Sequence, residues 1–105
     1  MGRSDRRELN SRLVVLLVHL LKWRHQPGAR SRSWSATITE QRLRIEKMLA
    51  ESPSLRPTVP GVAVEAYAIA RVRAEAETGL AESMFPAELP FAAEEILSAT
   101  FLPED

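Results

Sequence analysis

The segment from Asp5 to Arg24 carries apolar side chains around more than half of its circumference when it is drawn as a helix. At about 100° per residue, its leucines and one tryptophan form a stripe, which three further residues widen to roughly 220°. The stripe is Leu9, Leu13, Leu16, Leu17, Leu20 and Trp23, widened by Val14, Val18 and Leu21. A helix of this kind needs neighbours on several sides, so we predict that it is the central helix of a bundle.

Breaker and capping residues divide the remaining chain into three further predicted helices. Ser4 is the expected N-cap of the first helix, and Gln26-Pro27-Gly28 ends it. Ser31 or Ser33 caps the second helix, and Gly79 ends the third. No window shows the alternation of a strand. The expected fold is a single all-α domain over residues 1–105, a small helical bundle of three main helices (5–24, 33–51 and 58–79) plus a short C-terminal helix (90–97).

Small residues dominate one face of the third predicted helix. Ala63, Ala66, Ala70 and Ala74 share this face with Tyr67, and Ile69 lies beside it. We expect another helix to approach closely there, and we expect Arg71 and Glu75 to pair on the outer side. The closing Phe101-Leu102-Pro103 is expected to plug the core.

Charge is divided between the two halves of the chain, although the formal net charge is zero. Residues 1–56 hold twelve Lys and Arg against five Asp and Glu, and residues 57–105 hold two against nine. We expect the two halves to attract each other when the chain folds back. The sharper alternative, which we favour less, is a basic half that binds nucleic acid.

Residue types needed for metal or catalytic chemistry are scarce. The chain has no cysteine, which suits a reducing cytoplasm, and its two histidines, His19 and His25, lie about 240° apart around a helix. No phosphate-binding glycine loop or nucleophile elbow occurs among the four glycines. The apolar run from Leu13 to Leu21 is too short to span a membrane. We therefore expect a cytoplasmic protein that is not an enzyme, with no catalytic, cofactor or metal site and no membrane association.

The best candidate for a binding patch lies where the first helix ends and the second begins. His19, Lys22, Trp23, Arg32 and Trp34 are placed to meet around this corner. As a ligand site, the patch would hold an anion or an aromatic group through its cations and indole faces. As a structural element, its tryptophans would fasten the two helices together, and we favour this interpretation. The basic loop around residues 24–32 offers a nucleic-acid-binding protein as the alternative function.

Several strings of residues, in order and over nearly the whole chain, resemble the bacterial family known as domain of unknown function 29. The strings are His19-Leu20-Leu21-Lys22-Trp23, Arg32-Ser33-Trp34, Ser52-Pro53-Ser54-Leu55-Arg56-Pro57, Glu65-Ala66-Tyr67, Ala70-Arg71, Glu77-Thr78-Gly79-Leu80, Phe85-Pro86 and Phe101-Leu102-Pro103. The resemblance implies an all-helical fold in a bacterium. It carries over no catalytic residue.

The resemblance also implies an upstream part, because members of that family continue for several tens of residues before the position of Met1. We therefore expect an N-terminally incomplete member of the family. The wide apolar arc of the first helix favours the same expectation, and it predicts that Val14, Val18 and Leu21 are exposed. Exposed patches of this kind drive association. The function that we expect is protein–protein interaction or assembly, with another protein or a second copy as the partner.

Overall fold

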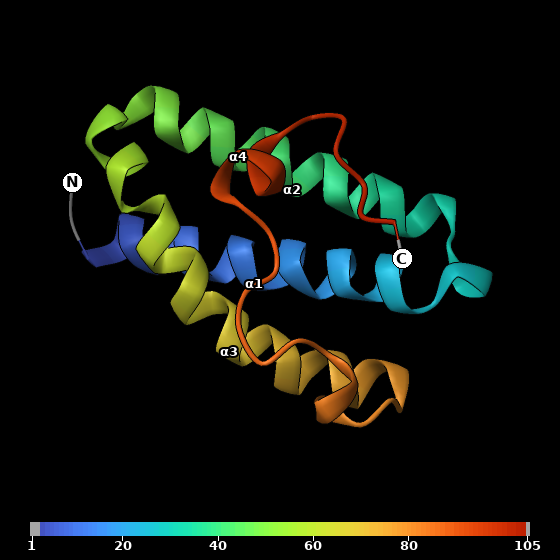
Figure 1. The fold of residues 1–105 in the computed structure, drawn as a ribbon. Helices are drawn as coiled ribbons and strands as arrows, with labels where there is room; N and C mark the ends of the chain where they lie inside the picture. The colour runs from blue at the N-terminus through green and yellow to red at the C-terminus, as the bar shows by residue number, and fades with distance from the viewer. Residues whose placement is uncertain (1–2, 105) are drawn as a thin grey trace.

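The computed structural model describes residues 3–104, which form helices and turns without any strand. The helices are α1 (Arg3–His25), α2 (Arg32–Glu51), α3 (Val59–Thr78) and the short α4 (Ala93–Leu97). Three short 3-10 helices lie between them: η1 (Pro27–Ala29), η2 (Pro53–Thr58) and η3 (Glu82–Met84). The predicted bundle of three main helices and a short C-terminal helix is confirmed (Figure 1).

The ends of the helices follow local capping chemistry. Ser31 Oγ accepts a hydrogen bond of 3.2 Å from the backbone N–H of Trp34, and Gly79 adopts the left-handed φ of 78° that ends α3. Two predicted starts are wrong. Ser4 lies inside α1, and α4 begins at Ala93 rather than at Pro90. The later start is explained by the Glu95 carboxylate, which accepts the N–H of Ala92 at 2.9 Å and so caps the helix there.

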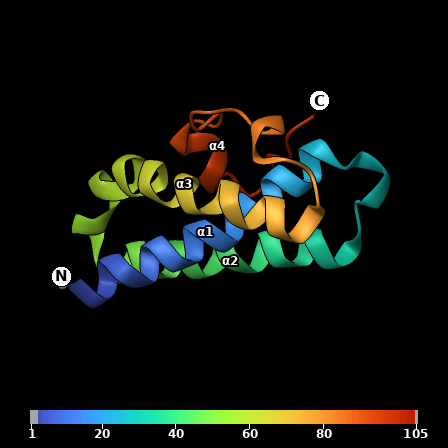
Figure 2. The ribbon, with the colours of Figure 1, turned by 90° about the horizontal axis from the view of Figure 1, so that it is seen from below.

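The first helix is central, as predicted, because α1 lies between α2 and α3 in both views (Figures 1 and 2). The predicted exposure of its wide arc is wrong: Val14 is 7% exposed, and Val18 and Leu21 are 0% exposed. The arc therefore gives no reason to expect a further covering element. Although α1 is rich in leucine, none of the helices in the described range is long and apolar enough to cross a membrane.

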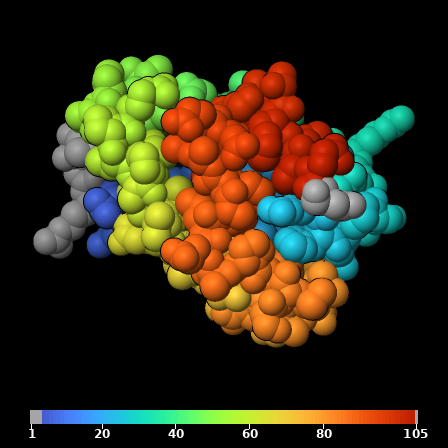
Figure 3. Space-filling view, viewed as in Figure 1, coloured from blue at the N-terminus to red at the C-terminus, as the bar shows by residue number. Residues whose placement is uncertain are grey.

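Residues 80–104, which we call the C-terminal segment, cover α1 together with α2 and α3. This segment crosses the molecule between α2 and α3, and Figure 3 shows its orange and red atoms across the middle of one face. Near its end, Pro103 is buried, and Phe101 and Leu102 are half-buried against the core. The prediction that these three residues plug the core is therefore confirmed. The large apolar side chains that it adds to the core are Leu80, Phe85, Leu89, Phe91, Ile96, Leu97, Phe101 and Leu102.

Two side chains from the main helices fasten this segment by donating to its backbone carbonyls. The Arg42 side chain is only 5% exposed, and its guanidinium donates to the carbonyls of Ile96 at 2.8 Å and Glu95 at 3.2 Å. The Tyr67 hydroxyl donates to the carbonyl of Pro86 at 2.6 Å. Burial lowers the pKa of Arg42 and raises the pKa of Tyr67. Both groups thus supply these carbonyls with a donor, and the Glu95 carbonyl also accepts the N–H of Ser98 at 3.3 Å.

Arg71 also fastens the C-terminal segment, and this corrects a sequence-based expectation. Its Nη2 donates to the carbonyls of Glu82 at 3.1 Å and Phe85 at 3.2 Å, and its Nη1 lies 3.3 Å from the Glu82 carboxylate. The expected pair between Arg71 and Glu75 is therefore wrong. Periodicity placed Arg71 on an outer side, but the returning chain covers that side and offers more acceptors than one carboxylate.

Candidate functional site

Three of the five predicted patch residues meet at one corner of the bundle. His19 and Lys22 come from α1, and Trp34 comes from the first turn of α2. Lys22 Nζ lies 5.0 Å from the centre of the Trp34 ring and 3.0 Å from Glu77 Oε1 on α3. One ammonium group therefore joins three helices, with a cation–π contact on one side and an ion pair on the other.

The other two patch residues lie in different surroundings. Trp23 packs against the core, and the Arg30 guanidinium lies 5.2 Å from the centre of its ring. Arg30 Nε also donates to the Trp23 carbonyl at 2.7 Å. Arg32 is exposed. In the described range, no hydrogen bond, ion pair or ring contact joins Trp23 or Arg32 to the corner, so the structure divides the predicted patch in two.

The electrostatics of the corner favour a neutral histidine between charged neighbours. His19 Nδ1 donates to the Val15 carbonyl at 2.8 Å. Burial is the main cause that lowers the pKa of His19, with Lys22 acting in the same direction and Glu77 in the opposite one. Arg73 donates to Glu77 at 2.8 Å and is the main reason why the pKa of that carboxyl is below its ordinary value.

Residue-by-residue pattern reading missed Arg73 and Glu77 as members of this corner, although the division of charge could have indicated such partners. The expectation that the two halves attract each other is confirmed, because ion pairs between described residues join them. These pairs are Arg6–Glu65 at 2.9 Å, Lys22–Glu77 at 3.0 Å and Arg30–Glu104 at 3.8 Å.

Some of the basic side chains in the loop around residues 24–32 are engaged in contacts within the molecule. Arg30 is bound to Trp23 and lies near Glu104, and the His25 ring packs edge-on against Phe85 with ring centres 5.0 Å apart. Arg32 remains exposed. Arg30 is therefore engaged within the molecule, whereas nucleic-acid affinity depends on several cations that can reach phosphates.

A different surface stands out in the structure, on the side of α3 that faces away from α1. Three large apolar side chains are exposed there: Val64 to 60%, Ile69 to 52% and Val72 to 56%. The opposite side of α3 holds the predicted alanine face, and Tyr67 is buried with it as expected. We define the outer face of α3 as these three side chains and the exposed alanines among them, Val64, Ala68, Ile69, Val72 and Ala76.

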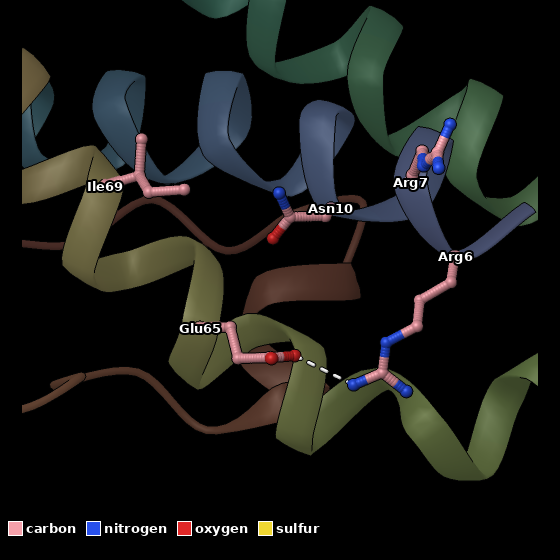
Figure 4. A pocket seen from close by; sticks show the side chains of 5 residues that line it. All are labelled: Arg6, Arg7, Asn10, Glu65 and Ile69. Atoms are coloured by element: carbon pink, nitrogen blue, oxygen red, sulfur yellow. Dashed lines mark hydrogen bonds and ion pairs between the residues drawn. The ribbon is translucent and has the colours of Figure 1, made fainter. Parts of the chain in front are cut away.

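Hollows border this outer face on both sides. One hollow, of about 390 Å³, is lined by Ile69 and Glu65 of α3 and by residues of α1. In Figure 4, Arg6 reaches across from α1 to Glu65, while Arg7 points away from this bridge. A second hollow lies where Val64 and Ala68 meet residues of the C-terminal segment. The outer face of α3 is thus a raised apolar row between two depressions.

The comparisons with known proteins place the chain in a family without naming an activity. A family model described as "Domain of unknown function DUF29" matches residues 1–102. No curated protein and no solved structure matches the chain. Because the matched range covers nearly the whole sequence, the resemblance drawn from its strings of residues is confirmed. The chain belongs to the DUF29 family.

Proposed function

We propose that this domain is a self-assembly module, in which the outer face of α3 packs against a second copy of the chain. The observation that carries this function is the group of three exposed side chains Val64, Ile69 and Val72 on one helix. Exposed apolar groups that lie together on a surface gain free energy when a partner removes them from water. The alanines between them leave room for a partner helix to approach closely.

A second copy of the chain suits this face because neither the net charge nor the charges at the rim of the face would make two copies repel each other. The formal net charge is zero, so two copies carry no overall repulsion at neutral pH. At the rim, Glu65 is paired with Arg6, and Arg73 is paired with Glu77. Because these charges are paired, the rim would not attract a strongly charged partner. An identical face carries the same paired charges and is not opposed by them.

The contact is expected to be small and therefore reversible. A helix of 20 residues is about 30 Å long, and one face of it with its borders falls at the low end of interface sizes. We expect a dimer that dissociates on dilution. We propose that the protein acts in a bacterial cytoplasm, because the family resemblance implies a bacterium and the lack of cysteine suits a reducing compartment.

The test is the mass of the chain in solution, measured by sedimentation over a wide range of concentrations. The wild-type mass should rise from 11.8 kDa towards twice that value as the concentration increases. Ile69→Glu places a charge at the centre of the outer face and should hold the mass at that of the monomer. Leu43→Glu is the matched control, because Leu43 is 67% exposed on α2, away from this face.

The control should associate like the wild type, and circular dichroism should show that both variants are folded. A wild-type chain that stays monomeric up to millimolar concentration would overturn the proposal. Equal loss of association in Ile69→Glu and Leu43→Glu would do the same, because it would show that the outer face of α3 is not the contact.

A further inference from the structure

We infer that the two copies pack α3 against α3 in antiparallel orientation, about a two-fold axis that passes beside Ala68 and Ile69. This arrangement rests on the proposed self-assembly and adds the register and direction of the contact. In a two-fold contact, if residue i of one copy faces residue j of the other, then j also faces i. The outer face must therefore be complementary to itself in one particular alignment.

Charges at the rim of the outer face favour the antiparallel direction. Glu65 lies four residues before Ile69 and Arg73 lies four residues after it, on the same row of the helix surface. An antiparallel pair centred there brings each Glu65 opposite Arg73 of the other copy. A parallel pair would instead bring Glu65 near Glu65 and Arg73 near Arg73. Like charges held together in this way oppose association.

Apolar side chains in the neighbouring row lead to the same alignment independently. Val64 lies four residues before Ala68 and Val72 lies four residues after it. An antiparallel pair centred on Ala68 brings Val64 opposite Val72 of the other copy. The centres of the two rows differ by one residue, about 1.5 Å along the helix, so one axis between them serves both rows. The small Ala68 side chain at the crossing permits close helix approach.

Present partners of the two charged residues leave them available for this contact. Arg6 and Glu65 lie 2.9 Å apart with side chains 57% and 61% exposed, and Arg73 and Glu77 lie 2.8 Å apart with side chains 49% and 33% exposed. Exposed pairs of this kind contribute little by themselves. In the antiparallel dimer the charges alternate along each side of the contact, from Arg6 through Glu65 to Arg73 and Glu77 of the second copy.

The test is a charge-reversal cycle, with the dimer dissociation constant measured by sedimentation. Glu65→Arg and Arg73→Glu should each raise the Kd by roughly tenfold, because each places two like-charge contacts in the dimer. The double variant should bring the Kd back to near the wild-type value, since it exchanges the two charges. In a parallel dimer, neither a single reversal nor the double one changes the balance of like charges.

The matched control reverses an exposed pair elsewhere, with Glu40→Arg and Arg44→Glu on α2, where the two side chains lie 3.0 Å apart. These variants change the net charge by the same amount and should leave the Kd unchanged. If Ile69→Glu abolishes the dimer but the charge cycle shows no loss and recovery, the antiparallel register is wrong and the self-assembly face stands. If the wild-type chain forms no dimer, the proposed function itself fails.

Discussion

Two helices of similar length, α1 with 23 residues and α3 with 20, treat their apolar side chains in opposite ways. On α1, leucines and valines cover more than half the circumference and are almost completely buried. On α3, the buried side is built mainly from alanines, and three larger side chains face outwards. The helix with more apolar surface is the one that exposes less of it.

The difference arises from position in the bundle and not from the helices' own composition. α1 is covered by α2, by α3 and by the C-terminal segment, whose apolar side chains join the same core. α3 lies at the rim, and hollows border its outer face on both sides. The surface that we propose for association therefore lies where the cover over the helices ends, and the density of apolar residues along the sequence does not locate it.

The largest expected effect tests the difference in burial between α1 and α3 by shortening one apolar side chain on each helix. Leu17→Ala should lower the free energy of unfolding by about 2 to 5 kcal/mol, because Leu17 is 0% exposed and its loss leaves a cavity. Val72→Ala should change it by less than about 0.5 kcal/mol in the monomer. Urea denaturation at a concentration where the chain is monomeric measures both. Similar losses for the two variants would show that α3 does not expose its outer face.

A second prediction tests how the cover over α1 is held. Arg42→Ala should cost about 2 kcal/mol, because the carbonyls of Glu95 and Ile96 lose a charged donor while they remain covered. Amide hydrogen exchange in residues 93–97 should accelerate. Arg44→Ala removes an exposed pair with Glu40 from the same helix and should cost under about 0.5 kcal/mol. An equal effect of both substitutions would mean that Arg42 does not anchor the segment.

The smallest expected effect concerns the corner between α1 and α3, and it is a dependence on pH. The folded-state pKa of His19 lies below its ordinary value of 6.5, so the unfolded chain binds more protons as the pH falls through that region. Stability contributed by His19 is present above that value and is lost at lower pH. Between about pH 7.5 and 5.5, His19→Gln should therefore lose less stability than the wild type.

The charged groups that face His19 are Lys22, Arg73 and Glu77, and the His19→Gln variant keeps all three. His25 is present in both proteins, so the difference between the two pH profiles isolates His19. Thermal unfolding followed by circular dichroism gives the profiles. Parallel profiles for the two proteins would show that burial of His19 is not linked to folding.

Sequence patterns predicted the helices and the central place of α1 because periodicity and breakers are local properties. Ser31 begins α2 and Gly79 ends α3 as expected, since capping depends on neighbours in the chain. The burial of Val14, Val18 and Leu21 was missed because it depends on how α2, α3 and the C-terminal segment pack around α1, which the pattern of α1 itself does not show. The inward position of Arg71 was missed for the same reason, as its acceptors are backbone carbonyls, which every sequence contains.

The candidate site was predicted only in part, and the reason is again distance along the chain. Periodicity placed Lys22 and Trp34 at one corner, but Glu77 reaches it from 55 residues further along. The outer face of α3 was not singled out, because Val64 and Val72 are exposed through the way the other elements pack, and the sequence of α3 does not show this. Exposure of this kind is decided by the whole fold.

The placement of the last covering residues after all the main helices has a consequence for synthesis on the ribosome. At about 5 to 20 residues per second, α1 is made several seconds before α3 and the C-terminal segment that enclose it. During that interval the nascent chain presents a leucine-rich helix together with an excess of unneutralised arginine. Completion of this core therefore has to wait for the C-terminal segment, which is made after all three main helices.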